Sequence, residues 1–278
     1  MRRFVRHFAA LAAVSLLAPT FASARPIQAA PLADIDAFVE NVRKTFNVPG
    51  IAVAIVKDGK VVLAKGYGVR KLGEATPVDE KTLFGIASNT KAFTCAAIAM
   101  LVEEGKLAWD DPVIKHVPGF LMYDAYVTRE MTVRDLVTHR AGLPLGAGDL
   151  LYFPETDYTR AEIAHRIRFL KPSTSFRSAY NYDNILYLVA GQVIESVTGK
   201  TWDDVIRERI FVPVGMTASS TTYKAMLSGN VATPHAPMDG VIRPIAPMNF
   251  DNNAPAASIN SNVEELARWA IVQLDGGS

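Results

Sequence analysis

The sequence predicts a mixed α/β (α+β) fold, in which an antiparallel sheet is flanked by helices and joined to an all-α region. The composition is typical of a globular protein, because 49% of the 278 residues are hydrophobic and 21% are charged. Residues 51–64 are predicted to form a β-hairpin, with Asp58 and Gly59 at a tight turn between two apolar runs. After residue 69 the chain consists almost entirely of helical patterns and loops. A small sheet covered by many helices fits these patterns.

Charge and cysteine content exclude several classes of protein. Lysine and arginine total 29 against 28 aspartate and glutamate residues, and no basic run follows the N-terminus, so we expect no nucleic-acid partner. The single cysteine, Cys95, excludes an intramolecular disulfide and every cysteine-rich zinc site. Metal-ligand spacing is also missing among His116, His139, His165 and His235. We therefore expect neither a metal nor a cofactor.

Residues 1–24 have the pattern of a secretory signal peptide. Three arginines precede an apolar stretch at residues 8–18, and the segment ends in an Ala-Ser-Ala sequence at Ala24. The apolar stretch is shorter than the roughly 20 residues that a membrane-spanning helix needs, so we expect no stable membrane anchor after cleavage. Cleavage after Ala24 would leave a secreted or periplasmic domain of residues 25–278.

The first predicted helix begins near residue 35 and ends before Pro49 and Gly50. Its apolar residues recur at helical spacing, at Ile35, Phe38, Val39, Val42 and Phe46. The hairpin follows, and both of its strands are apolar on both faces. A strand of that kind needs cover above and below, so we expect the hairpin to lie within a larger sheet with helices packed on it.

The remaining predicted elements are helices separated by loops. The helices are expected at residues 88–104, 132–139, 159–169, 184–198, 201–210 and 261–274. Capping boxes are expected to begin three of these helices, pairing Thr159 with Glu162, Thr201 with Asp204 and Ser261 with Glu264. Residues 112–213 should form a mainly helical subdomain. Three segments are long enough to be walls of a functional site and not mere connectors, at residues 109–131, 142–158 and 217–260.

Ser88 and Lys91 are the first candidates for catalysis. They lie three residues apart at the start of a predicted helix, so their side chains share one face of one turn. A serine hydroxyl becomes a good nucleophile when a base takes its proton, and a lysine can do so only as the neutral amine, which burial or nearby positive charge favours. The alternative is a capping serine beside a surface lysine, because the spacing alone is common.

Tyr182 and Asn184 are the second pair of candidates, on a loop that leads into a predicted helix. A phenol beside a lysine can relay a proton between Ser88 and a leaving group, and an amide can donate to a substrate carbonyl while it accepts from Lys91. In the alternative interpretation this segment is a plain turn, with Asn184 capping the helix.

These segments together resemble the serine β-lactamase and penicillin-binding protein superfamily, in particular the class C β-lactamase branch with its esterase and D-aminopeptidase relatives. The resemblance extends from residue 35 to 274 and depends on FGIASNTKAFT, YDNILYLVAGQVIESVTG, LVTHRAGLP and FVPVGM. It implies a β-lactamase/transpeptidase-like fold with a serine nucleophile at Ser88. It further implies that Lys91 is a base, that Tyr182 is the general base or proton relay, and that Asn184 positions the substrate.

One element of the superfamily has no counterpart in this sequence. The resemblance implies a Lys-Thr-Gly or His-x-Gly element on a strand well after Asn184, and that strand would also supply one backbone donor of the oxyanion hole. His235 is not followed by the expected glycine, and Lys200-Thr201 lies at a helix start. Because no convincing strand follows residue 69 and the hairpin alone is marginal, we expect an incomplete domain that lacks its C-terminal sheet strands.

The combined interpretation is an exported serine hydrolase that forms an acyl-enzyme on Ser88 with a β-lactam, amide or ester, taking a small molecule or a peptide as substrate. The rival interpretation is a non-catalytic penicillin-binding or sensor-type protein of the same fold, which the missing element favours. An α/β-hydrolase is disfavoured because no G-x-S-x-G motif occurs, and Gly66-Tyr67-Gly68 is not followed by the glycine-opened helix of a dinucleotide site.

Overall fold

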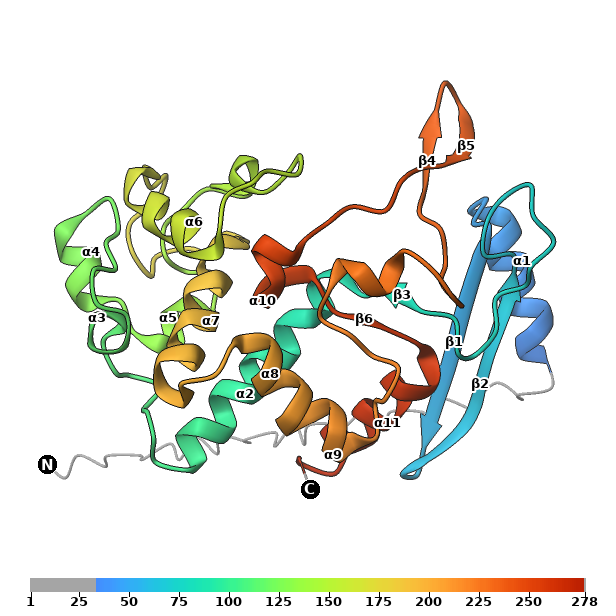
Figure 1. Cartoon of the computed structure of the whole chain (residues 1–278), viewed down its shortest axis with the longest axis horizontal. Coiled ribbons are helices and arrows are strands. Elements are labelled where there is room, and N and C mark those ends of the chain that lie inside the picture. The colour runs from blue at the N-terminus through green and yellow to red at the C-terminus, as the bar shows by residue number, and fades with distance from the viewer. Residues whose placement is uncertain (1–33, 278) are drawn as a thin grey trace, which may run out of the picture.

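The computed structural model describes residues 34–277, and the predicted signal peptide at residues 1–24 lies outside them. Figure 1 shows a hairpin of two long strands at one end of the molecule and a group of helices, α3 to α7, at the other. Helices α2 and α8 lie between the two ends, and a short hairpin, β4–β5, projects from the body. The predicted mixture of a small antiparallel sheet and many helices is confirmed.

The elements have the following bounds. The helices are α1 (Ile35–Thr45), α2 (Thr90–Glu103), α3 (Val113–His116), α4 (Ala125–Glu130), α5 (Val133–Leu136), α6 (Arg160–Arg166), α7 (Ile185–Thr198), α8 (Trp202–Ile206), α9 (Val212–Val214), α10 (Ala254–Ala257) and α11 (Val263–Leu274). The strands are β1 (Gly50–Lys57), β2 (Lys60–Gly68), β3 (Phe84–Gly85), β4 (His235–Met238), β5 (Val241–Pro244) and β6 (Asn260–Ser261). Strands β1 and β2 pair from Gly50 opposite Gly68 to the turn that joins Lys57 to Lys60, as predicted.

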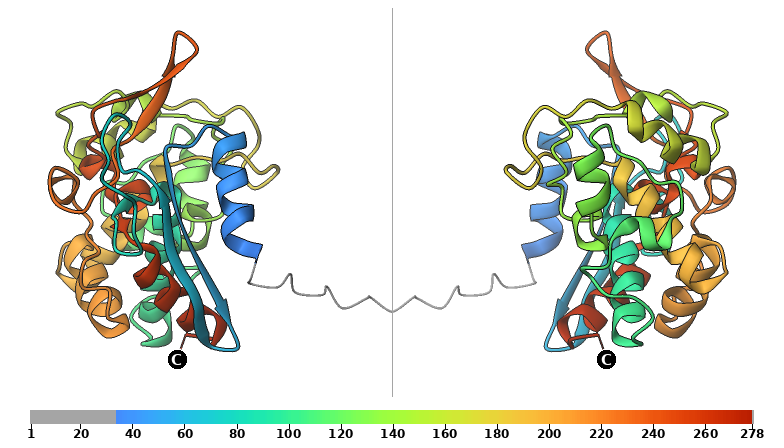
Figure 2. Two further views of the ribbon diagram at one scale, coloured as in Figure 1. Left: turned by 90° about the vertical axis from the view of Figure 1, so that its right-hand side faces the viewer. Right: turned by 90° about the vertical axis from the view of Figure 1, so that its left-hand side faces the viewer.

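Helices cover the two faces of the β1–β2 hairpin. Helix α1 packs on one face and α11 on the other, as Figure 2 shows with the hairpin between them. The predicted helical cover is therefore present, but the larger sheet is not seen, because within residues 34–277 each strand pairs only with the other. Val61 and Val62 near the turn remain 39% and 41% exposed, since neither helix covers that end of β2 fully.

The expectation that no strand follows residue 69 is wrong. Strand β3 pairs with β6, and β4 pairs with β5, both in antiparallel register. Two of these strands have only two residues, and both strands of the projecting hairpin contain a proline. Such short or proline-containing strands lack the alternation that reveals a strand in a sequence.

The core of the molecule is formed where α2 packs against α7. Helix α7 is apolar on almost every face and is buried along most of its length, as expected for a helix in the middle of a domain. Helix α2 contributes Phe93, Ile98 and Leu101, each at most 1% exposed, and the ring of Phe93 stacks on Trp269 of α11 at 4.3 Å. This packing fixes the start of α2 against the start of α7.

The predicted helix starts are correct at two of the three capping positions. Thr159 and Glu162 form a full capping box before α6, and the Thr201 side chain accepts from the backbone N–H of Asp204. The third prediction is wrong by one residue: Asn262, not Ser261, caps α11. Ser261 belongs to β6, and its hydroxyl bonds that of Ser219 at 2.8 Å, so a tertiary contact takes it away from the helix.

The segments predicted as long loops contain short elements. Residues 109–131 include α3 and α4, which are only four and six residues long and so show little periodicity. From residue 112 to 213 the regular elements are helical, apart from a single bridge between Pro112 and Thr132. Within residues 34–277, none of the helices has the length and apolar character needed to cross a membrane.

Candidate active site

Ser88 lies in a single 3₁₀ turn, Ala87–Asn89, directly before α2. The preceding residue, Ala87, has φ of 47° although it is not a glycine. Left-handed backbone at such a residue costs about 1–3 kcal/mol, and residues strained in this way cluster at functional sites. The turn leaves Ser88 exposed at the surface while the helix behind it is buried.

Lys91 lies in the first turn of α2 and is only 7% exposed. Its Nζ donates to Ser88 Oγ at 3.0 Å, as the shared helical face predicts. It also donates to Asn184 Oδ1 at 2.8 Å and to the carbonyl oxygen of Ala256 at 3.1 Å. Lys91 is therefore not the surface lysine of the alternative interpretation. The oxygens of Asn184 and Ala256 hold its amine beside the serine hydroxyl.

Tyr182 approaches the same hydroxyl from the other side. Its OH donates to Ser88 Oγ at 2.6 Å, and the centre of its ring lies 4.9 Å from Lys91 Nζ. Ser88 Oγ thus has two groups that can transfer a proton within hydrogen-bond distance, the amine of Lys91 and the phenol of Tyr182. This is the arrangement that activates a nucleophilic hydroxyl.

Asn184 precedes α7, but its side chain makes no capping hydrogen bond, so the capping alternative is wrong. The neighbouring Asp183 caps the helix instead, because its Oδ1 accepts from the backbone N–H of Leu186 at 3.3 Å. The Asn184 amide is consequently turned toward Lys91 and the centre of the site. The four residues proposed from the sequence, Ser88, Lys91, Tyr182 and Asn184, are brought together in one cluster.

His139 supports Tyr182 from behind. The two rings lie 4.5 Å apart at an angle of 30°, and Nδ1 of His139 accepts from the backbone N–H of Asp183 at 3.2 Å. His139 is therefore a structural residue, hydrogen-bonded to the loop before α7. Tyr187 of α7 completes the group, with its ring 5.2 Å from Lys91 Nζ and its OH bonded to the Val137 carbonyl at 3.0 Å. Burial raises the pKa of Tyr187, so its phenol stays protonated.

Two contacts of the site involve residues that sequence patterns do not single out, Asp149 and Ala256. The Asn184 amide donates to Asp149 at 3.2 Å, from a loop 35 residues earlier, and the Ala256 carbonyl reaches Lys91 from 165 residues later. A backbone carbonyl carries no signature of residue type. Asp149 follows the turn glycines Gly146 and Gly148 in the 142–158 segment, which is expected to be a wall of a functional site. This turn sequence is the feature of the sequence from which Asp149 could have been predicted.

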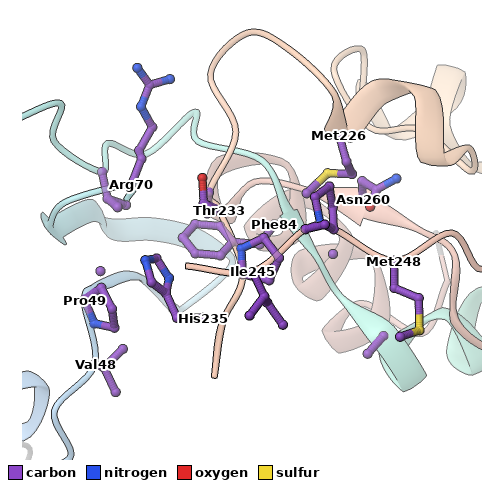
Figure 3. Close-up of a pocket in the computed structure, with 18 of the residues that line it drawn as sticks. Val48, Pro49, Arg70, Phe84, Met226, Thr233, His235, Ile245, Met248 and Asn260 are labelled. Carbon is purple, nitrogen blue, oxygen red and sulfur yellow. The ribbon is translucent and has the colours of Figure 1, made fainter. Parts of the chain in front are cut away.

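A cavity of about 570 Å³ lies next to the site, between the start of β1, the β3–β6 pair and the segments around the projecting hairpin. Figure 3 shows side chains from these segments around it. Its lining is largely apolar, and the labelled residues are Val48, Pro49, Arg70, Phe84, Met226, Thr233, His235, Ile245, Met248 and Asn260. The cavity reaches Ala87 but none of the four clustered residues lines it. We take the cluster as the candidate active site, because the groups that can transfer protons converge there.

The arrangement resembles known proteins in sequence and in structure. Residues 35–278 match the family described as Beta-lactamase. Among curated proteins, the unguisins hydrolase ungD' of Aspergillus campestris is 31% identical over 253 residues, which are 85% of this chain and 46% of that protein. Protein flp of Staphylococcus aureus strain COL is 30% identical over 247 residues, which are 87% of this chain and 48% of that protein. The chain spans about half the length of these curated relatives.

Solved structures show the same fold. The octameric penicillin-binding protein homologue from Pyrococcus abyssi superposes with a TM-score of 0.77 at 28% identity, over 90% of this chain and 57% of the other. The D-amino acid amidase from Ochrobactrum anthropi SV3 gives a TM-score of 0.74 at 23% identity, over 88% of this chain and 70% of the other, which supports the fold alone. The family match, the shared fold and the Ser88 cluster lead to one conclusion: this chain belongs to the beta-lactamase family and has its serine hydrolase fold.

Proposed function

We propose that this protein is a serine hydrolase that forms an acyl-enzyme on Ser88. The observation that carries the proposal is the convergence of Lys91 Nζ and Tyr182 OH on Ser88 Oγ, at 3.0 and 2.6 Å. A serine held only for structure has no need of two such groups, one of them a lysine 7% exposed. A base within hydrogen-bond reach is the first requirement of a nucleophilic hydroxyl.

The reaction follows from the positions of these groups. Ser88 Oγ bonds to the substrate carbonyl carbon, and its proton passes to the Lys91–Tyr182 pair. When the bond from that carbon to the leaving nitrogen or oxygen breaks, the pair gives the proton to the leaving group. Water then attacks the carbonyl carbon of the acyl-enzyme ester, and the Lys91–Tyr182 pair takes a proton from this water. The pair returns that proton to Ser88 Oγ as the carboxylic acid is released. The pair ends each half-reaction as it began, so no further reactant is needed.

The proposed substrates are strained or activated amides and esters, including β-lactams. Support comes from the names of the relatives, which describe a hydrolase, a penicillin-binding protein homologue and a D-amino acid amidase. We further propose, from the order of the two motifs in the sequence, that the chain belongs to the class C branch of the family. We further propose that the protein is exported to the periplasm or secreted, on the pattern of residues 1–24.

Covalent labelling tests the proposal. A fluorescent penicillin and a fluorophosphonate probe should each label the purified protein, and Ser88→Ala should abolish both labels. Ser178→Ala is the matched control, because Ser178 is an exposed serine whose hydroxyl donates to the nearby Ser175 carbonyl at 2.7 Å, and it should label normally. Absence of both labels from the unaltered protein would contradict the proposal. Labelling by penicillin without release would favour the penicillin-binding or sensor-type interpretation.

A further inference from the structure

We propose that Asp149 is a positioning residue of this site, which fixes the orientation of the Asn184 amide and thereby the place of Lys91 beside Ser88. The predicted effect on the reaction rests on the proposed function, whereas the predicted effect on the amide does not. Asp149 touches neither Ser88 nor Lys91 in the described hydrogen bonds, so it acts through Asn184.

The loop that carries Asp149 is built to reach the start of α7. Gly146 and Gly148 have φ of 71° and 82°, the left-handed region that favours glycine. The Asp149 N–H donates to the Gly146 carbonyl at 3.0 Å, and the Gly146 N–H donates to the Tyr182 carbonyl at 3.4 Å. A Cβ at Gly148 would lie 2.3 Å from Cδ1 of Ile185. The turn therefore packs directly on the residues that flank Asn184.

The Asp149 carboxylate has two partners there. Asn184 Nδ2 lies 3.2 Å from Oδ1 and 3.4 Å from Oδ2, and the hydroxyl of Tyr152 donates to Oδ1. Tyr152 is 4% exposed, and burial together with this hydrogen bond raises its pKa, so its phenol remains a donor. Asp149 is thus a carboxylate held in place by one buried phenol and aimed at one amide.

The two ends of an amide are chemically different, and this difference sets the orientation. The Asn184 carbonyl oxygen can only accept, its nitrogen only donates, and the two ends meet Lys91 and Asp149 respectively. A flipped amide would direct its N–H groups at the lysine N–H groups and its oxygen at the carboxylate, so both contacts would be lost. Lys91 and Asp149 therefore select the same orientation from opposite ends.

The position of Lys91 depends on that orientation. The bond from Lys91 Nζ to Asn184 Oδ1, at 2.8 Å, is the shortest of its three described hydrogen bonds. If the amide turns, the amine keeps only the Ser88 hydroxyl and the Ala256 carbonyl, and it has no fixed direction toward the serine. A displacement of about 1 Å in a reacting group can cost on the order of 100-fold in rate.

A double-mutant cycle on the full chain tests the route through Asn184. The rate of Ser88 labelling by a fluorophosphonate is measured for Asp149→Ala, Asn184→Ala and the double variant. Asp149→Ala should slow labelling by about 10- to 100-fold, and it should add nothing in the Asn184→Ala background, because residues that act as a unit are not additive. Equal slowing in both backgrounds would show that Asp149 does not act through Asn184 and would overturn the proposal.

Two further variants separate positioning from folding. Asp149→Asn keeps the shape of the side chain but offers an N–H as well as an oxygen, so it no longer selects one orientation of Asn184. We expect an unchanged melting temperature and labelling at least about fivefold slower. Labelling as fast as in the unaltered protein would contradict the proposal. Asp157→Asn, at an exposed carboxylate of the same segment that has no described contact with the site, is the control and should stay within about threefold.

A measurement that does not depend on any reaction at Ser88 tests this inference separately from the proposed function. Solvent exchange of the Asn184 side-chain amide protons, followed by NMR in uniformly ¹⁵N-labelled protein, should be faster in Asp149→Ala than in the unaltered protein, because the acceptor is gone. Unchanged exchange would overturn the positioning role. If the unaltered protein fails to label, the proposed function fails, and the exchange experiment still decides whether Asp149 orients the amide.

Discussion

The hydroxyl of Tyr182 lies 2.6 Å from Ser88 Oγ, although 94 residues separate the two in the chain. Local structure places each residue separately, Ser88 in the turn before α2 and Tyr182 in the loop before α7, but it does not bring the two together. The contact exists because the two helices pack with their first turns side by side. The proposed reactivity of Ser88 therefore depends on the helix packing as much as on the serine.

Removing either proton-transferring group should slow acylation of Ser88. Tyr182→Phe and Lys91→Ala are each expected to reduce the rate of fluorophosphonate labelling by about 100-fold, because each removes one group that can take the serine proton. The double variant should be little slower than either single variant, since the two act on one proton. Tyr123→Phe, at an exposed tyrosine, is the control. Independent, multiplying effects would contradict the shared role.

His139 should contribute to stability and to rate through different contacts. His139→Phe keeps a ring against Tyr182 but leaves the N–H of Asp183 without its acceptor, so we expect a loss of about 1–3 kcal/mol in the free energy of unfolding. His139→Leu also loses the ring and should in addition slow labelling. Urea unfolding and labelling rates give the two readouts, with exposed His165→Leu as control. Equal labelling by both variants would exclude a role for the ring.

Stability should fall in acid through the pair of Asp135 and Arg177. Burial by itself would raise the pKa of Asp135, but hydrogen bonds from Arg177 at 2.6 and 2.9 Å and from Thr132 outweigh it and hold that pKa below its usual value. A carboxyl whose folded pKa is lowered stabilises the fold above its unfolded pKa of about 3.9, and this contribution is lost as the pH falls through the folded pKa.

Asp135→Asn should therefore lower the free energy of unfolding at pH 7 and have a smaller effect near pH 3. Urea titrations at the two pH values measure the difference. The exposed carboxylate of Asp157 provides the control, because Asp157→Asn removes an equal charge from the surface. An Asp135→Asn effect that does not shrink in acid would contradict this account of the pair.

A methyl group at Gly148 should be more harmful than one at Gly229. Both glycines have positive φ, 82° and 95°, so alanine carries backbone strain at either place. Only at Gly148 does the new Cβ also meet another atom, Cδ1 of Ile185 at 2.3 Å, whereas space around Gly229 is open. Gly148→Ala should cost about 1–3 kcal/mol more in unfolding free energy, the usual range for overpacking. Equal losses would show that Ile185 gives way without cost.

Export should remove the first 24 residues. Expression of the full chain in a Gram-negative bacterium should yield periplasmic protein whose N-terminal sequence begins at Arg25, because signal peptidase cleaves after small residues such as those ending at Ala24. Replacing Ala22 and Ala24 by larger residues should block processing. An intact N-terminus found in the membrane fraction would contradict the prediction.

The sequence predicts best those elements that local patterns determine. Helix α7 and the β1–β2 hairpin carry strong apolar patterns and end at glycine or at an Asp-Gly turn, so α7 and the turn lie where predicted, although β2 continues to Gly68, beyond the predicted residue 64. The cap of α11 was misplaced because Ser261 and Asn262 are both good capping residues, and only the tertiary contact with Ser219 decides between them. Two-residue strands such as β3 are fixed by their partner and leave no local signal.

The candidate site, too, is predictable from the sequence only where local patterns determine it. Ser88 and Lys91 could be paired from their spacing on one helical turn, and Tyr182 with Asn184 from their order in the chain. Sequence alone could not show that Asn184 turns away from its helix, because this depends on Asp183 taking the capping role. Nor could it show Asp149 or the Ala256 carbonyl, whose contacts are made by chain segments that are distant in sequence.

Because the site requires α2 to be packed on α7, its formation also reports when this step of folding has taken place. Long-range contacts form only after the entropy of closing the intervening loop has been overcome, so the start of α2 can meet the start of α7 only when the 90 or so residues between them have compacted. A chain that has formed both helices but has not docked them holds an ordinary serine. In a refolding experiment, the onset of probe labelling at Ser88 would mark the moment at which the two halves of the molecule join.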